Sequence, residues 1–120
     1  HRLRMGGARF RTLFDSLGLP LVVTDLQGGV LDVSPGLAAL VGTEASALVT
    51  RPLDELLGEA GAGHWRSALE RFSSGVRGEP VRFAVTLPGG RAGEAVCAPV
   101  ADEDGEDAEV VVLLHPDPGP

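Results

Sequence analysis

The sequence predicts a small α/β domain of the α+β kind, in which strands form an antiparallel sheet and short helices cover one face. Two observations predict it. Runs rich in β-branched residues flank a glycine turn between residues 21 and 33, and a capped helical segment follows directly. Farther along, residues 81–87 alternate between large apolar side chains and small or polar ones, which is typical of a half-buried strand.

The segment from residue 21 to residue 42 is predicted to form a hairpin and then a short helix. Gly28 and Gly29 can supply the positive φ that a tight turn after Asp25 requires. Ser34 is suited to cap the helix and Pro35 to occupy its first position. The apolar face of this helix and its terminal glycine are Leu37, Leu40, Val41 and Gly42.

The order of these elements resembles the opening of a PAS domain, a family in which a D-x-x-G hairpin leads into a V-N-x-A…L-G helix. Residues 42–48 and 51–57 resemble the short connecting helices of that family, and 64–72 resemble its long connector helix. The resemblance implies a PAS fold with a five-stranded antiparallel sheet, short helices on one face and a preceding amphipathic helix. The segments similar to its last three strands are 80–87, 93–100 and 108–114.

Three positions depart from the family pattern. Ser34 stands where Asn is usual, and Thr50 stands where a glycine usually precedes Arg51-Pro52. The D-I-T sequence that often passes the last strand to an effector is replaced by His115-Pro116-Asp117. Because the prolines in 116–120 remove backbone donors and disfavour α conformation, we expect an extended or disordered tail rather than a helix.

Length and composition indicate one soluble domain. The 120 residues suffice for a single modest core, and 43% of them are hydrophobic. No apolar run is long enough for a membrane span and no signal-peptide layout is present, so a cytoplasmic location is expected. We expect a flexible segment over 1–8, the PAS domain over 9–115 with its N-terminal helix at about 9–18, and a proline-rich tail over 116–120.

The net charge of −7 is distributed unevenly along the chain. Acidic residues gather between 102 and 109, whereas arginines gather between 2 and 11. No nucleic-acid partner is expected, because binding a phosphate backbone requires a folded basic face. The acidic segment is interpreted as a solvated loop between two strands, and a contact for a basic partner is the alternative.

An amphipathic helix is predicted before the first strand, and Gly18 and Pro20 end it. Its apolar face has to be covered, either by the sheet of its own chain or by a second subunit. Since the family resemblance implies a homodimer, we expect this face to form the dimer contact and to carry the signal. The residues of the face are Phe10, Leu13, Phe14 and Leu17.

A second amphipathic helix is predicted over 64–72, with Trp65, Ala68, Leu69 and Phe72 on its inward side. The glycine-rich segment 58–63 before it is predicted to be a mobile loop. It does not fit a phosphate-binding loop, because no strand precedes it and no Lys-Ser or Lys-Thr pair follows it.

The strand at 81–87 is predicted to return through a three-residue loop at 88–90. A loop of odd length keeps the apolar side chains of both strands on one face, which places Glu94 toward water and small residues toward the core. Small residues on a core face indicate either a bulky neighbour or a cavity kept for a ligand. The candidate ligand-pocket residues are Val23, Leu37, Leu40, Leu56, Trp65, Leu69, Phe83, Val85, Ala95 and Cys97.

The chain offers little chemistry for catalysis, and no enzyme activity is expected. Neither a nucleophile elbow nor a paired-histidine metal motif is present. The single cysteine, Cys97, excludes an internal disulfide and is interpreted as a small buried hydrophobe rather than a reactive thiol. No metal is expected.

No cofactor is expected either. The one alternative is haem, with His64 as its ligand. In haem-binding PAS sensors an axial histidine lies near the start of the connector helix, so the resemblance makes His64 a candidate haem ligand. A flavin is not expected, because 53–65 lack the reactive-cysteine motif of the light-sensing branch.

These features and the resemblance predict a sensory or regulatory module of a larger signalling protein. In the first hypothesis, the domain binds a small apolar molecule or a partner and relays its state through dimer contacts to a covalently linked output domain. In the second, it is a structural dimerisation module whose pocket is filled by its own side chains. In the third, it is a gas sensor that binds haem through His64.

Overall fold

A computed structural model of the protein describes residues 18–74, 80–101 and 107–117, and these residues form a five-stranded sheet with helices on one face. The elements in chain order are β1 (Leu21–Thr24), β2 (Val30–Val33), α2 (Pro35–Val41), α3 (Ala45–Leu48), the 3-10 helix η1 (Leu53–Leu56), α4 (Gly58–Ser73), β3 (Val81–Leu87), β4 (Arg91–Ala101) and β5 (Asp107–Pro116).

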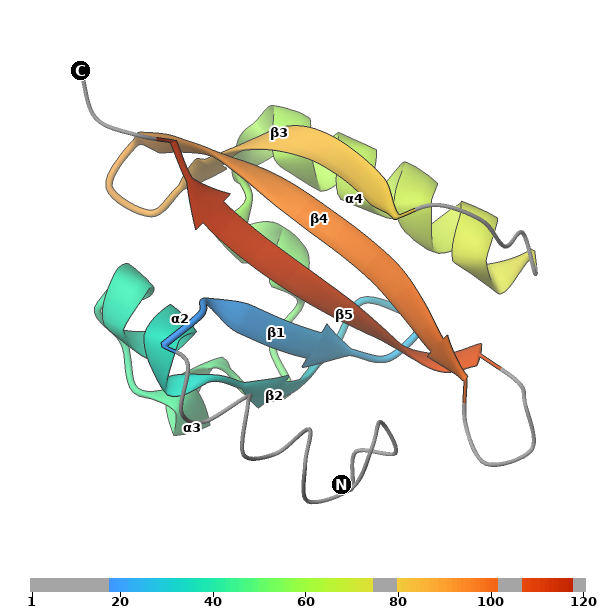
Figure 1. The fold of residues 1–120 in the computed structure, drawn as a ribbon, viewed down its shortest axis with the longest axis horizontal. Coiled ribbons are helices and arrows are strands. Elements are labelled where there is room, and N and C mark those ends of the chain that lie inside the picture. Colours follow the sequence, from blue (N-terminus) through green and yellow to red (C-terminus); the bar gives the residue numbers. More distant parts are fainter. Residues whose placement is uncertain (1–17, 75–79, 102–106, 118–120) are drawn as a thin grey trace.

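The strands lie in the order β2-β1-β5-β4-β3, and all neighbours are antiparallel. Figure 1 shows the long strands β4 and β5 crossing the molecule diagonally, with β1 and β2 beside β5 and α4 running along β3. The last strand in the sequence is therefore the central strand, paired with the first. The predicted five-stranded antiparallel sheet with short helices is confirmed.

Side chains alternate between an inner face of the sheet, which the helices cover, and an outer face on the opposite side. On β5, Val110, Val112 and Leu114 point inward and are fully buried, while Val111 and Leu113 point outward and are partly exposed. The paired strands follow the same alternation because the register is continuous across β1, β5, β4 and β3. The core lies between the inner face and the helices.

The turn between β1 and β2 is organised by one carboxylate. Asp25 Oδ1 accepts hydrogen bonds from the backbone N–H groups of Gln27 at 2.9 Å and Gly29 at 2.8 Å. Gly28 has the predicted positive φ, at 92°. The same expectation for Gly29 is wrong, because this residue continues toward β2 and forms a β-bridge with Pro52.

Helix α2 begins at a buried serine. Ser34 Oγ accepts a hydrogen bond from Leu37 N at 3.2 Å, and a proline occupies the first helical position. The same oxygen accepts from Leu21 N at 2.9 Å and donates to the carbonyl of Leu19 at 2.6 Å. At the other end, Gly42 adopts the left-handed conformation with φ 70°. Both predicted caps are confirmed, and Ser34 also ties α2 to the start of β1.

The segment between α2 and α4 contains α3 and η1, as predicted, and a strained residue between them. Thr50 has φ 76° and is the one non-glycine with positive φ in the described part of the chain. Its N–H donates to the carbonyl of Val30 at 2.8 Å, and Val30 N donates to the carbonyl of Arg51 at 2.9 Å. These bonds attach the segment to the edge strand β2 and hold Thr50 in a conformation that suits glycine better.

Helix α4 begins earlier than predicted. The glycine-rich segment 58–63 is its first part rather than a loop, so that prediction is wrong. The physical reason is close packing: a Cβ built on Gly61 would lie 3.0 Å from Val85 Cγ1 and 3.1 Å from Leu57 Cβ. Glycine lets this end of α4 approach β3, and the packing offsets the low helix propensity of glycine.

The turn between β3 and β4 has the predicted three residues. Leu87 pairs with Arg91, and Phe83 pairs with Ala95, so the apolar side chains of both strands share the inner face. Strand β5 continues to Pro116, and Asp117 N donates to the carbonyl of Ala92 at 3.0 Å. The chain is therefore extended up to Asp117, as predicted, whereas 118–120 lie outside the described residues.

Candidate functional site

Most of the predicted pocket residues meet in one buried cluster between the sheet and the helices. Trp65 and Leu69 come from α4, Leu37 comes from α2, and the others come from inward positions of β3 and β4. Trp65 is the largest fully buried side chain among the described residues, at 1% exposure. The members of the predicted set in this cluster are Leu37, Trp65, Leu69, Phe83, Val85, Ala95 and Cys97.

Three predicted residues lie elsewhere. Leu40 and Leu56 are partly buried and lie against the cluster from its margin. Val23 is fully buried but points to the outer face, since it pairs with Val111, and its inward neighbour Val22 joins the cluster instead. Assignment of Val23 to the inner pocket is wrong. The run 21–24 is too uniformly apolar to show which side chains face inward, and only the pairing with β5 decides it.

The cluster also contains residues that were not predicted as pocket residues. Leu53 and Leu57 are fully buried and flank the partly buried Leu56. Their spacing of four residues was the available signal, because it places them on one side of a helical segment. The inner residues Val110, Val112 and Leu114 of β5 were recognised as a strand but could not be placed at the sheet centre without its topology.

Small residues on the inner face are covered by neighbouring atoms. A Cβ on Gly93 of β4 would lie 2.8 Å from the carbonyl oxygen of His115 and 3.1 Å from Leu87 Cδ1. A Cβ on Gly61, which belongs to α4 and faces β3, would lie 3.0 Å from Val85 Cγ1. Of the two readings for such small residues, a bulky or close neighbour holds at these two glycines.

The polar groups inside the cluster are few and uncharged. Ser34 makes the three hydrogen bonds described above, and the hydroxyl of the buried Thr24 donates to the carbonyl of Asp25 at 2.9 Å. Burial raises the pKa of the Cys97 thiol from 9.0 to about 12, so the thiol is protonated at neutral pH. The interpretation of Cys97 as a buried, unreactive residue agrees with this environment.

Trp65 carries the other polar atom of the cluster, the indole nitrogen. Its Nε1 lies beside the β1–β2 turn, because a Cβ built on Gly28 would be 3.2 Å from it and 3.0 Å from Leu69 Cδ1. The hydrogen bonds of the described residues include none from this N–H group. The neighbouring turn is already satisfied, since the carbonyl of Gly28 accepts from Leu53 N at 2.9 Å.

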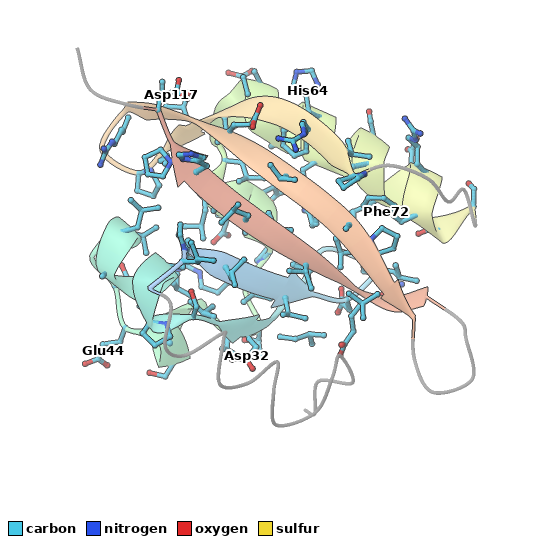
Figure 2. The ribbon with its side chains drawn as sticks, viewed as in Figure 1. Asp32, Glu44, His64, Phe72 and Asp117 are labelled. Carbon is cyan, nitrogen blue, oxygen red and sulfur yellow. The ribbon has the colours of Figure 1, made fainter. Side chains whose placement is uncertain are left out.

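His64 lies outside the cluster. It is exposed on α4, its ring centroid is 5.7 Å from that of Phe83, and Figure 2 shows it at the rim of the molecule. An axial haem ligand has to point into an enclosed apolar cavity large enough for the porphyrin. An exposed imidazole beside Phe83 does not fit that requirement. The described residues also contain no group of three side chains able to hold a metal ion.

The predicted dimer-contact residues Phe10, Leu13, Phe14 and Leu17 lie outside the described residues. The outer face of the sheet is described, and its centre is apolar. Val96, Val111 and Leu113 are partly exposed there, with Glu94 and Arg82 forming an ion pair at 3.4 Å toward one side. Among the residues that the structure describes, no helix has the length and apolar character needed to cross a membrane.

Comparisons with known proteins identify the fold independently of these arguments. No curated protein matches the chain. Among solved structures, the PAS domain of an HTR-like protein from Haloarcula marismortui is 18% identical, with a TM-score of 0.72 over 92% of this chain and 90% of that chain. The PAS domain of a protein from Colwellia psychrerythraea is 20% identical, with a TM-score of 0.71 over 91% and 94% of the two chains.

A third structure is a domain of a sensory box sensor histidine kinase/response regulator from Geobacter sulfurreducens. It is 21% identical, with a TM-score of 0.69 over 89% of this chain and 90% of that chain. At these identities the structures show a shared fold. The family described as PAS fold matches residues 14–116, which is most of the sequence. The chain therefore belongs to the PAS fold family.

Proposed function

We propose that this domain is a sensory module of a larger signalling protein, that it binds a small, mostly apolar molecule or a partner, and that it relays its state through dimer contacts to a covalently linked output domain. The observation that carries the proposal is membership of the PAS fold family over 14–116. The similar domain from a sensor histidine kinase/response regulator supports it. We further propose that the module acts in the cytoplasm and has no catalytic role.

The dimer part of the proposal is tested on the full 120-residue chain. Phe14 lies on the apolar face of the helix predicted over 9–18, and Thr12 lies on the opposite face. In sedimentation velocity at high protein concentration, Phe14→Glu is expected to dissociate a dimer that Thr12→Glu leaves intact. A wild-type chain that is monomeric throughout the concentration range contradicts dimer relay.

A second candidate is a structural dimerisation module with a self-filled core. The close contacts at Gly61 and Gly93 favour it, because neighbouring side-chain and backbone atoms occupy the space that these small residues leave. Native mass spectrometry of the protein purified from its host separates the two candidates. A bound small molecule of defined mass supports the ligand-binding sensor, and its absence together with a stable dimer supports the structural module.

The haem sensor is the least supported of the three, because His64 is exposed and its ring lies beside that of Phe83 at an interplanar angle of 35°. An absorbance scan after addition of haemin tests it. We expect either no Soret band or a band that His64→Ala leaves unchanged. A Soret band that disappears in His64→Ala would restore the gas-sensor hypothesis.

A further inference from the structure

The buried indole of Trp65 is the feature that the proposed function does not yet explain. Buried tryptophan N–H groups usually donate a hydrogen bond, because leaving such a donor unpaired costs about 1–3 kcal/mol. Trp65 is 1% exposed, and no described acceptor receives its Nε1 proton. An orphaned donor in a native core calls for a functional or structural reason.

The surroundings of this donor restrict what it can bind. Its nearest neighbours beside the turn are Gly28 and Leu69, and the cluster around them is hydrophobic. Among the described residues, the buried polar or charged side chains are Thr24, Ser34 and Glu109, and no buried Lys, Arg or His is present. The buried Glu109 belongs to the outer face, because Val110 beside it points inward. An N–H donor cannot hold a cation, and an anionic ligand would lose its hydration without gaining a buried counter-charge.

We propose that the Trp65 N–H holds a neutral, mostly apolar ligand through a single hydrogen-bond acceptor, such as a ketone or ester carbonyl oxygen. This inference rests on the proposed ligand-binding function and names the ligand class for it. Thr24 and Ser34 already donate to backbone carbonyls, so Trp65 is the remaining side-chain N–H or O–H donor of the described core.

The position of the donor also connects the ligand to the fold. Gly28 belongs to the β1–β2 turn, whereas Trp65 and Leu69 belong to α4, and the turn accepts a hydrogen bond from Leu53 at the start of η1. Nε1 itself lies at the boundary between the turn and α4. A hydrogen bond to Nε1 therefore acts next to the contact between these two elements.

Three seven-carbon probes test the chemistry: 2-heptanone, heptane and heptanoate. The chain has one tryptophan and no tyrosine, so fluorescence and the single indole N–H resonance in a ¹H–¹⁵N spectrum both report on Trp65 alone. We expect 2-heptanone to bind about fivefold or more tightly than heptane and to shift the indole proton downfield, whereas heptanoate binds most weakly.

Two variants assign the difference to the indole donor. Trp65→Phe removes the N–H and is expected to lower 2-heptanone affinity to that of heptane, measured by competition with a solvatochromic dye. Phe72→Leu trims another buried aromatic of α4 and is expected to weaken both probes alike. If Trp65→Phe does not fold, the wild-type indole resonance decides, since only a hydrogen-bonded probe shifts it downfield.

The outcomes separate this inference from the function on which it rests. Equal binding of 2-heptanone and heptane, with no downfield shift of the indole proton, overturns the inference and leaves ligand binding standing. Failure of every probe to bind overturns the inference, and native mass spectrometry of the purified protein then decides between the ligand-binding sensor and the structural module. Preferential binding of heptanoate also overturns the inference, because it requires a buried cation, and the described residues contain none.

Discussion

The two hairpin turns of the sheet have nearly the same φ at their key glycines but different surroundings. Gly28, between β1 and β2, has φ 92°, and Gly89, between β3 and β4, has φ 89°. A Cβ on Gly28 would meet Leu69 and Trp65 within 3.2 Å, whereas a Cβ on Gly89 would meet nothing within 4 Å. The first turn packs on the core, and the second reverses the chain in solvent.

This difference shows that glycine can serve two purposes in a turn, to supply a positive φ and to allow close packing, and that the sequence does not distinguish them. At residues 88–90 glycine supplies only the left-handed conformation. At residues 25–29 it also allows α4 to touch the turn, and the Gly28 carbonyl accepts a hydrogen bond from Leu53. The first turn is thus in contact with the core, and the second is not.

The largest expected effect comes from removing the side chain under the first turn. Leu69→Ala deletes a buried leucine in contact range of Gly28, and we expect the free energy of unfolding to fall by about 2–5 kcal/mol. Arg91→Ala, directly after the exposed second turn, is the control and should change it by less than about 0.5 kcal/mol. Urea unfolding followed by circular dichroism measures both. Equal effects would contradict the distinction between the turns.

The next effect compares the two glycines directly. Gly28→Ala and Gly89→Ala impose the same backbone penalty of about 1 kcal/mol, because both positions have positive φ. Gly28→Ala adds overpacking against Leu69 and Trp65, so we expect a total loss of about 2–4 kcal/mol.

Trp65 fluorescence provides a second readout of the same pair. Its emission should change in Gly28→Ala, whose new methyl group lies against the indole, and stay unchanged in Gly89→Ala. Variants that are equally stable and spectroscopically identical would show that the first turn does not pack on α4.

How far the sequence predicts this molecule depends on whether local patterns or long-range contacts decide a feature. The face assignment of β3 follows from its alternation, and the Ser34 and Gly42 caps follow from local backbone chemistry. Val23 was assigned to the wrong face because residues 21–24 lack alternation, and the register with β5 decides it. Likewise, contact with Val85 makes 58–63 helical against its intrinsic propensity.

The candidate site shows the same limit. Sequence spacing placed Trp65 and Leu69 on the buried side of α4, and the structure agrees. The unpaired state of the Trp65 N–H could not be predicted, since it depends on which acceptors the β1–β2 turn and the rest of the fold leave near Nε1. Functional detail of this kind requires the folded geometry.

A smaller effect is expected at the carboxylate that shapes the first turn. Asp25 Oδ1 accepts two backbone hydrogen bonds, and Asp25→Ala leaves both N–H donors without it, at a cost of about 1–2 kcal/mol in unfolding free energy. Asp25→Asn keeps an acceptor oxygen in the same place and should restore most of the loss. Thermal unfolding of the three proteins at neutral pH measures this. If Asn is as destabilising as Ala, charge rather than hydrogen bonding shapes the turn.

The smallest effect should be a gain in the free energy of unfolding, because it concerns Thr50, a non-glycine residue at a position whose φ favours glycine. Thr50 is exposed and has φ 76°, a conformation that costs a β-branched residue about 1–2 kcal/mol. Thr50→Gly relieves this strain but adds freedom to the unfolded chain, so we expect a net gain of about 0.5 kcal/mol. Thr50→Ala keeps the strained φ and should gain less. Guanidinium unfolding of the three proteins measures these differences. The midpoints can be compared directly if the m value, the dependence of unfolding free energy on denaturant concentration, is the same in all three. A loss of stability in Thr50→Gly would contradict this expectation. It would mean that contacts of the Thr50 side chain stabilise the link between β2 and η1 and offset the backbone strain.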